Sequence, residues 1–473
     1  MATQLGARTS TDAYYLALSI PVIVYAVLLV AVKMGGIPNL TAIANEERRS
    51  LSQAASELVT ATAAGATLLS VILTVSMMVL LPAAAGGSTR FQELTRQFLV
   101  ELSPYAVTGA LLGAMGAVLA VRGSFVIATA VLGIEPVLKT LLVVLFHHQL
   151  GVQALVIGNL VGNAFAVLIL WRALSRAGVS LRPVAFGHSQ VVRRIFRLSG
   201  PLVLSSILLQ LNPLIDRATA AAVGPGSVTV FELGVRLFNA PMALVSASLI
   251  APLAATWSER YIRDGWSAVT GSFSRGLSTL VVVAIPLVAI GFLARHDLVE
   301  FAYSSHAYSR SSVDRTASVL GALLLGLVPQ IMVLPLSTLF LVRKDTVFPL
   351  KVGIANCTLN AALDLALRGP LGVTGIAAST TITLTFLCGV YVWKAQRRWG
   401  EIGLAHFRTA AAIATVSCGL IVGAGAALTR VLPAGTSRWH ALASGSAIVA
   451  TGAAILGALL LYCRRVPALR WMR

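Results

Sequence analysis

Four polar residues stand inside stretches that are otherwise apolar: Asp216, Asn360, Asp364 and Thr380. Polar and ionisable groups are rare and costly inside membrane-spanning segments, and they are usually functional. Two carboxylates, an amide and a hydroxyl are hard oxygen ligands that suit a small alkali cation. Asn360 and Asp364 share one helix face because they are four residues apart, and Asp216 could reach them from another helix. The pattern predicts a buried cation site, with a proton site and a structural set of hydrogen bonds as alternatives.

Two further charged pairs lie inside apolar stretches. Glu232 and Arg236 are four residues apart, so they could neutralise each other on one helix face. Alternatively, the planar fork of Arg236 could grip the diphosphate of a lipid-linked sugar. Glu135 and Lys139 have the same spacing, and for them we expect a structural neutral pair.

The composition is that of a membrane protein. Hydrophobic residues make up 57% of the 473 residues and charged residues 11%, whereas a soluble chain carries about 25% charged residues. The formal net charge is +19, but the basic residues lie in short loops, which favours topology signals over a nucleic-acid surface. The four cysteines have no metal-ligand spacing, and no G-x-x-x-x-G-K-[ST] run occurs for ATP. No catalytic triad or metal cluster can be built from the histidines, so we do not expect an enzyme.

Apolar stretches of about 20 residues predict about thirteen membrane-spanning helices. They lie near 12–34, 54–82, 98–121, 124–147, 151–173, 196–222, 227–257, 268–294, 316–342, 346–367, 371–394, 407–429 and 439–463. The loops richest in Arg and Lys then fall on the side of the C-terminus, which places the C-terminus in the cytoplasm. The odd count leaves the N-terminus outside without a signal peptide, so we expect a further helix encoded upstream of Met1.

The chain also repeats itself weakly. The stretch 12–21 has a counterpart at 229–238, and the loop Arg122-Gly123-Ser124-Phe125 has one at Arg343-Lys344-Asp345-Thr346. Because the orientation of the copies is the same, the repeat predicts two lobes related by an axis normal to the membrane. The predicted fold is all-α, with a five-helix lobe over 1–173, a basic linker over 174–195, a six-helix lobe over 196–394 and two added helices over 395–473.

Several stretches resemble the MurJ (MviN) family of lipid II flippases, which belongs to the multidrug/oligosaccharidyl-lipid/polysaccharide exporter superfamily. The clearest are Leu211-Asn212-Pro213-Leu214-Ile215-Asp216-Arg217, Gly224-Pro225-Gly226-Ser227-Val228, Ser103-Pro104-Tyr105 and Glu135-Pro136-Val137-Leu138. Their order and spacing cover essentially the whole chain. The family has fourteen helices, so the resemblance implies that the first helix is absent from this chain. Residues 13–32 contain no arginine, and Ser19 stands where the family usually has a basic residue.

The resemblance also implies roles for individual residues. The sodium site of the family maps onto Asp216, Asn360, Asp364 and Thr380, with the Ile376 carbonyl as a possible further ligand. The family has a cavity arginine at the position of Arg236 and an acidic residue at that of Asp12, where a negative charge at the start of a helix would also be favourable. The predicted substrate-binding residues are Arg236, Asp12, Arg217 and Glu232.

These observations predict a flippase for an undecaprenyl-diphosphate-linked saccharide, lipid II or a related envelope precursor, in the bacterial cytoplasmic membrane. Its lobes would rock about a central cavity, with a bound cation such as Na⁺ biasing one state. One alternative is an exporter of drugs or small molecules from the same superfamily. The other is a membrane scaffold that recruits cell-wall synthesis enzymes without transport. Membrane lipids and the lipid-linked saccharide are the expected partners, and nucleic acid is not.

Overall fold

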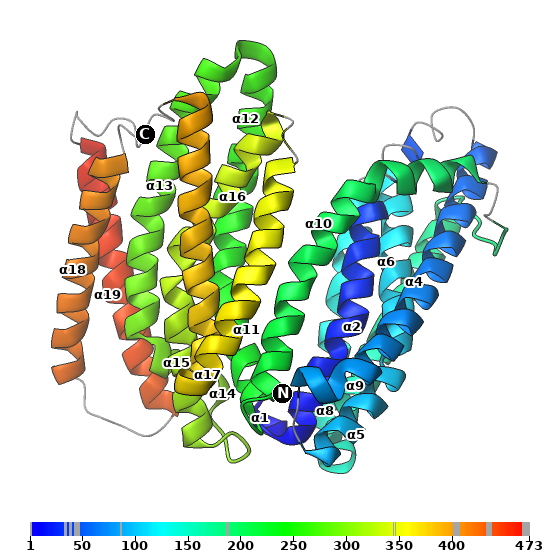
Figure 1. Cartoon of the computed structure of the whole chain (residues 1–473), viewed down its shortest axis with the longest axis horizontal. Coiled ribbons are helices and arrows are strands. Elements are labelled where there is room, and N and C mark those ends of the chain that lie inside the picture. Colours follow the sequence, from blue (N-terminus) through cyan, green and yellow to red (C-terminus); the bar gives the residue numbers. More distant parts are fainter. Residues whose placement is uncertain are drawn as a thin grey trace. The chain divides into compact units, whose positions relative to one another are not determined.

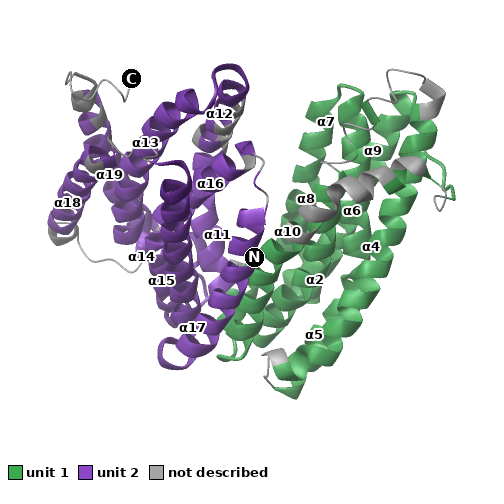
Figure 2. Cartoon of the chain, turned by 45° about the horizontal axis from the view of Figure 1, so that its top comes forward, with its two compact units in different colours: residues 1–229 green, residues 230–473 purple. Residues whose placement is uncertain are grey.

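The computed structural model describes residues 2–32, 36, 40–41, 48–85, 88–185, 189–343, 345, 347–400, 407–431 and 438–465, and these form helices joined by turns (Figure 1). Two compact units, residues 1–229 and 230–473, divide the chain (Figure 2). The elements of the first unit are α1 (Ala2–Leu5), α2 (Thr9–Ala31), α4 (Arg48–Ala85), α5 (Thr89–Glu101), α6 (Ser103–Val121), α7 (Phe125–Ala130), η2 (Val131–Gly133), α8 (Ile134–Leu150), α9 (Gln153–Arg176) and α10 (Gln190–Ala221). Those that follow are α11 (Ser227–Val245), which begins at the division, η3 (Ser246–Ile250), α12 (Ala251–Asp264), α13 (Trp266–Leu293), α14 (Arg295–Tyr303), α15 (Arg310–Leu325), α16 (Leu327–Val342), α17 (Val347–Trp399), α18 (Phe407–Val431) and α19 (Arg438–Arg465).

The prediction of an all-α, multi-span membrane fold is confirmed. Among the described residues, ten helices are long and apolar enough to cross a membrane, or eleven if the bent pair Arg310–Leu325 and Leu327–Phe340 forms one span. Besides this bent pair, one merged helix and one helix outside the ten lower the count from the predicted thirteen. The predicted spans 346–367 and 371–394 both lie in α17, and the predicted span 196–222 lies in α10, which is not among the ten.

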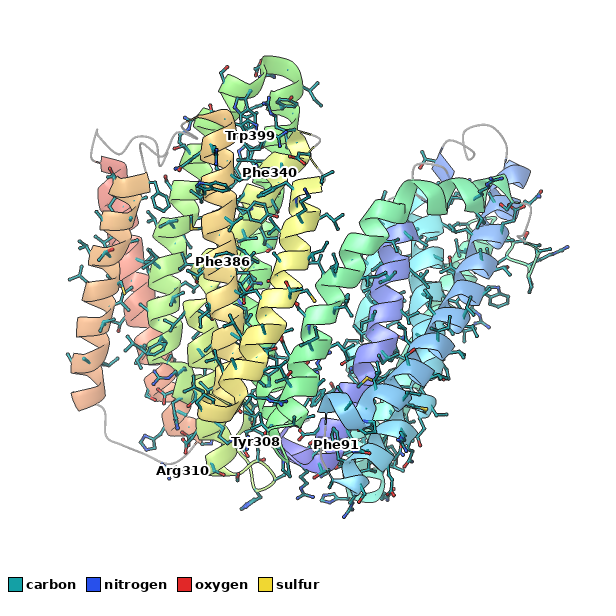
Figure 3. All side chains as sticks on the ribbon, viewed as in Figure 1. Phe91, Tyr308, Arg310, Phe340, Phe386 and Trp399 are labelled. Carbon is teal, nitrogen blue, oxygen red and sulfur yellow. The ribbon has the colours of Figure 1, made fainter. Side chains whose placement is uncertain are left out.

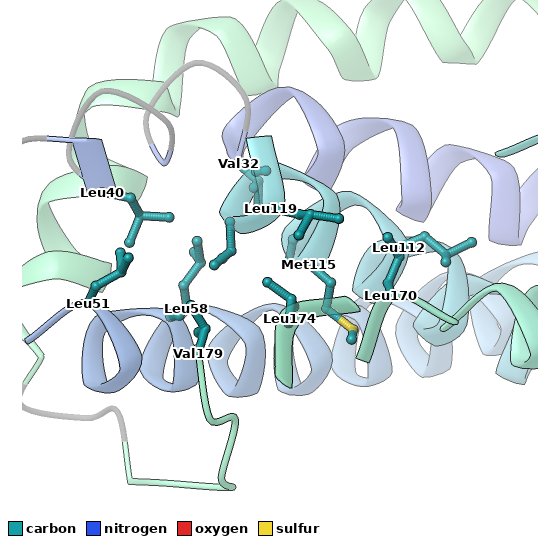
Figure 4. Close-up of a cluster of buried hydrophobic side chains, with 14 of the residues drawn as sticks. Val32, Leu40, Leu51, Leu58, Leu112, Met115, Leu119, Leu170, Leu174 and Val179 are labelled. Carbon is teal, nitrogen blue, oxygen red and sulfur yellow. The ribbon is translucent and has the colours of Figure 1, made fainter. Parts of the chain in front are cut away.

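Unit 1 is built on close helix pairs. Helix α8 packs along α9, α2 along α10, and α6 against both α4 and α9. A cluster of buried apolar side chains joins three of these helices, with Leu58 from α4, Met115 and Leu119 from α6, and Leu170 and Leu174 from α9 (Figure 4). In a membrane such clusters stabilise by van der Waals contact, because lipid tails are as apolar as leucine.

Unit 2 carries an aromatic cluster at the end of α17. The rings of Phe340 and Trp399, both labelled in Figure 3, have centroids 4.6 Å apart. The Trp266 ring centroid lies 5.0 Å from that of Trp399. The guanidinium carbon of Arg343 lies 4.6 Å from the centre of the Trp266 ring, which is within cation–π range. Tryptophan and arginine together are typical of the membrane–water interface, so the cluster fits the end of a span.

The division between the units differs from the predicted lobes. The sequence predicts that 196–222 begins the second lobe, but α10 packs along α2 and α4 and falls in unit 1. The two C-terminal helices, predicted as an addition after residue 395, pack on α13 and α14 within unit 2. Packing divides the chain after Thr229, whereas the lobes follow the internal repeat, and the lobes therefore stay a prediction.

Candidate functional site

The predicted polar cluster lies on the two halves of α17. This helix turns at Gly372, where a φ of 58° and a ψ of −139° describe a backbone conformation that glycine adopts readily. Asn360 and Asp364 lie before the turn, where they are 2% and 0% exposed. Asn360 Nδ2 donates to Asp364 Oδ2 at 3.3 Å. The predicted sharing of one helix face is thus confirmed for this pair.

The second half of α17 faces this pair with hydroxyl and carbonyl oxygens. Ser379 Oγ is hydrogen-bonded to Asp364 Oδ1 and lies 2.7 Å from the Ile376 carbonyl oxygen. Thr380 Oγ1 donates to the same carbonyl at 3.2 Å. The turn at Gly372 therefore brings Asp364, Ile376 and Ser379 into one contact network.

Ser379 was missed in the sequence analysis although it is fully buried and touches Asp364 directly. Its only signal in the sequence is its place in a Ser-Thr-Thr run, where Thr380 was chosen instead. Neighbouring residues on a helix point about 100° apart, so only the packing of the two halves decides which hydroxyl reaches the carboxylate.

The donor set of this cluster suits a hard monovalent cation. Asp364 offers a carboxylate, Asn360 an amide oxygen, Ile376 a carbonyl, and Ser379 and Thr380 hydroxyl oxygens, all of them oxygen ligands. Groups of three or more His, Cys, Asp or Glu that could hold a metal are absent from the described residues.

Asp216 lies on α10 in unit 1 and is 8% exposed. The other predicted ligands, Asn360, Asp364, Ile376 and Thr380, lie in unit 2. The structure therefore assembles the α17 part of the cluster, and the participation of Asp216 stays a prediction.

The charged pair on α11 is present as predicted. Arg236 Nε lies 3.4 Å from Glu232 Oε1, and the side chains are 41% and 11% exposed. Glu232 is thus the buried member, and it holds an arginine whose side chain remains accessible. The contact fits mutual neutralisation, and the role of Arg236 on a diphosphate stays a prediction.

Arg217 and Ser19 form a contact within unit 1. Arg217 Nη1 donates to Ser19 Oγ at 2.9 Å, and Ser19 is 2% exposed. An arginine from α10 therefore reaches the position on α2 that lacks a basic residue of its own. The contact of Arg217 with α2 joins two helices far apart in the sequence, so residue spacing could not predict it.

Asp12 caps the start of α11 from the start of α2. Its Oδ2 accepts a hydrogen bond from Gly226 N at 2.6 Å, and its Oδ1 accepts from Thr229 N at 2.8 Å and Thr229 Oγ1 at 2.7 Å. Asp12 is 2% exposed. A carboxylate at a helix N-terminus is favourable, and the Asp12 carboxylate provides this stabilisation to α11 as well as to α2. Asp12 therefore has a structural role, and its role in substrate binding stays a prediction.

Buried carboxylate, amide and hydroxyl groups inside a multi-span helical bundle are typical of membrane transport proteins. The fold is similar to a solved structure described as lipid II flippase MurJ, inward closed conformation, with 16% identity, a TM-score of 0.78 and coverage of 98% of this chain and 94% of the other. An inward-facing multidrug resistance MATE family transporter of the MOP superfamily gives a TM-score of 0.70 at 16% identity, over 86% and 93% of the two chains. At such identities the likeness establishes the fold alone.

The family model described as lipid II flippase MurJ matches residues 1–441, and the chain belongs to this family. A probable lipid II flippase MurJ of Synechocystis sp. is 23% identical over 85% of this chain and 78% of its own length. One of Rickettsia prowazekii is 20% identical over 67% of this chain and 63% of its own length. One of Haemophilus influenzae is 24% identical over 57% and 54%. The chain thus spans between about half and four-fifths of these relatives.

Proposed function

We propose that this protein is a flippase that moves an undecaprenyl-diphosphate-linked saccharide, lipid II or a closely related envelope precursor, across the bacterial cytoplasmic membrane. The observation that carries the proposal is the match of the MurJ family model to residues 1–441. The MurJ-like fold over 98% of the chain supports it. A multidrug exporter is not favoured, because the similarity to MATE transporters concerns the fold only.

The head group of such a substrate carries a diphosphate, which is best held by planar guanidinium groups. Arg236 is the candidate in unit 2, since its side chain is 41% exposed beside the buried Glu232. A ligand phosphate would replace the long contact at 3.4 Å with shorter charge-assisted hydrogen bonds. Arg217 is the second candidate, in unit 1, and Ser19 would orient its guanidinium.

A monovalent cation, with Na⁺ as the first candidate, would bind at the α17 cluster and drive the cycle. Asp364 supplies the charge, and Asn360, Ile376, Ser379 and Thr380 supply neutral oxygens. A cation biases a conformational equilibrium only by its difference in affinity between the two states. Because Asp364 and Ser379 lie on the two halves of α17, opening of this helix pair would weaken the site and provide that difference.

The orientation that follows from the basic loops has the C-terminus in the cytoplasm. The saccharide would then enter from the inner leaflet, where its head group is made, and leave at the outer leaflet. Contacts with cell-wall synthesis enzymes are a natural extension, because such enzymes use the substrate after transport.

The test replaces an essential lipid II flippase with the full product of this gene in a depletion strain. We expect growth to be restored by the natural sequence, and not by Arg236→Ala or Arg236→Lys, because an ammonium cannot make the planar two-point contact. Arg275→Ala, at an exposed arginine of α13, is the matched control and should restore growth. Lack of growth with the natural protein present in the membrane would overturn the proposal, and growth with Arg236→Ala would restrict Arg236 to a structural role.

A further inference from the structure

A second buried polar network lies in unit 1, around the Glu135–Lys139 pair that the spacing predicted to be neutral and structural. Lys139 Nζ lies 2.5 Å from Glu135 Oε1 and donates to Asn159 Oδ1 at 3.1 Å. Asn159 Nδ2 in turn donates to Tyr14 Oη at 2.7 Å. The network therefore joins α8, α9 and α2 around one ammonium group.

This network lies deep in the membrane-spanning part of unit 1. The apolar span Phe125–Leu150 contains both charges near its middle, and the side chains of Lys139 and Glu135 are 16% and 14% exposed. Asn159 is fully buried and Tyr14 is 1% exposed. Charges at such a depth are retained only if they are paired, and here the ammonium has a carboxylate and an amide oxygen as acceptors.

The helix pair α8–α9 has a counterpart in α17, 221 residues later in the chain (122 to 343). The loops at Arg122 and Arg343 mark the start of the two copies, and Leu150-Gly151-Val152 corresponds to Leu371-Gly372-Val373. The backbone agrees: Gly151 has φ 54° and ψ −129°, and Gly372 has φ 58° and ψ −139°. Both turns use the same unusual conformation, which favours glycine, so the two helix pairs are copies of one design.

The same spacing of 221 residues aligns three positions of the two polar networks, while the carboxylates stand at different positions, because Glu135 corresponds to Asn356 and Asp364 to Val143. Lys139 corresponds to Asn360, Asn159 to Thr380, and Gly158 to Ser379. In unit 2 the neutral Asn360 amide and Ser379 hydroxyl contact Asp364 and Thr380 bonds to the Ile376 carbonyl, whereas in unit 1 the lysine at position 139 brings its own positive charge. We propose that the Lys139 ammonium is a tethered cation that permanently fills a second monovalent-cation site, formed by Glu135 and Asn159, with Tyr14 accepting a hydrogen bond from Asn159.

The chemistry of the ligands supports this assignment. An ammonium is a compact point charge, and the atoms around it, a carboxylate oxygen and an amide oxygen, are the types that bind hard cations. Gly158 lets α9 approach closely, since a Cβ there would lie 2.8 Å from Lys139 Cα. A side chain on Gly158, like that of Ser379, would therefore not fit beside the lysine.

The test removes the tethered charge and offers free ions instead. The protein carries Asp364→Asn, which silences the α17 cluster, and is studied in phosphatidylcholine nanodiscs without any transport assay. In this background we expect Lys139→Ala to melt at a temperature on the order of 5 °C higher in saturating Na⁺, K⁺ or methylammonium chloride than in choline chloride at equal ionic strength. The parent with Lys139 intact should show no such difference, because its site is already filled.

Two further variants show whether the effect belongs to this site. Glu135→Gln combined with Lys139→Ala should abolish the response, since the ion loses its carboxylate. Lys351→Ala, at an exposed lysine of α17, is the matched control and should give no response. Equal melting of Lys139→Ala in all salts would overturn the proposal. The proposal would also be overturned if Lys139→Ala failed to fold in every salt while Glu135→Gln/Lys139→Met folded. Free ions would then be unable to replace the lysine ammonium. The outcome is independent of the substrate, so it is distinguishable from failure of the proposed flippase function.

Discussion

The helix pair α8–α9 and the two halves of α17 share a turn but differ in how their polar positions are filled. In unit 1 the negative charge of Glu135 is neutralised by the positive charge of Lys139, a residue of the same helix. In unit 2 the position that corresponds to Lys139 holds Asn360. Asp364 there is hydrogen-bonded to the Asn360 amide and to the Ser379 hydroxyl. Two copies of one backbone turn thus differ in whether the carboxylate is paired with a cationic side chain or with neutral groups.

The difference follows from single residues and not from the fold. A lysine at position 139 supplies the positive charge, and a glycine at 158 supplies the space for α9 to approach it. Asparagine and serine at the matching positions of α17 remove the charge and add oxygens. Substitutions at these positions can therefore make the two regions more alike or more different.

The largest expected effect comes from breaking the ion pair of unit 1. Lys139→Met leaves the Glu135 carboxylate buried without its partner, which should cost about 3–5 kcal/mol of unfolding free energy. Glu135→Gln/Lys139→Met removes both charges and should cost far less. Denaturant unfolding in mixed micelles measures the unfolding free energy of both variants. Equal losses in the single and the double variant would show that the cost does not come from an unpaired Glu135 carboxylate.

A smaller effect is expected at the glycine that separates the two networks. Gly158→Ala places a Cβ 2.8 Å from the backbone of Lys139, and the resulting strain should cost about 1–3 kcal/mol. Gly116→Ala is the matched control, because nothing lies within 4 Å of its new Cβ, and it should be neutral or stabilising by up to about 1 kcal/mol. The prediction fails if the two variants melt at the same temperature.

The unit 2 cluster should respond to sodium. Sodium at ten times its Kd would stabilise the natural protein by about 1.4 kcal/mol, and potassium should do less. Asp364→Ala should erase the difference, whereas Asp314→Ala, at a carboxylate that is 59% exposed, should keep it. Thermal melting in matched salts measures the effect, and a sodium response that survives in Asp364→Ala would place the ion elsewhere.

The smallest effect concerns the loops at the start of the two copies. In unit 2, burial raises the pKa of Asp345, but hydrogen bonds from Phe348 N and the Arg398 guanidinium outweigh it, so the pKa lies below its ordinary value. In unit 1, Arg122 Nη2 instead donates to the Ala177 carbonyl oxygen at 3.1 Å. The two loops therefore hold equivalent helix ends by different means, one with a carboxylate and one without.

This difference predicts a pH dependence for one loop only. A carboxyl with a lowered pKa contributes stability above its unfolded pKa of about 3.9, and the contribution is lost as the pH falls through the folded value. The loss from Arg398→Gln should thus be present at neutral pH, below about 1 kcal/mol for so accessible a pair, and should vanish in acid. The loss from Arg122→Gln should not change with pH. Melting curves at several pH values test this, and parallel behaviour of the two variants would contradict it.

The sequence predicted what depends on local pattern. Apolar stretches gave the helices, and a spacing of four residues placed Asn360 beside Asp364, Glu232 beside Arg236 and Glu135 beside Lys139. Contacts between helices were not predictable in the same way. Ser379, Asn159 and Tyr14 complete their networks through packing of separate segments, and Asp12 caps a helix that begins 215 residues later (12 to 227). The division after Thr229 also depends on packing, since the sequence of neither α10 nor α2 alone shows that the two helices pack side by side.

A positive charge that is part of the polypeptide cannot be exchanged between the two sides of a membrane. If Lys139 is the permanent occupant of the unit 1 site and the α17 cluster loads one monovalent cation, these two sites would carry one ion in each turnover. A membrane potential of 100 mV would then contribute about 2.3 kcal/mol through that ion. Since about 1.4 kcal/mol corresponds to tenfold, this contribution would correspond to a ratio of roughly 50 in substrate concentration across the bilayer.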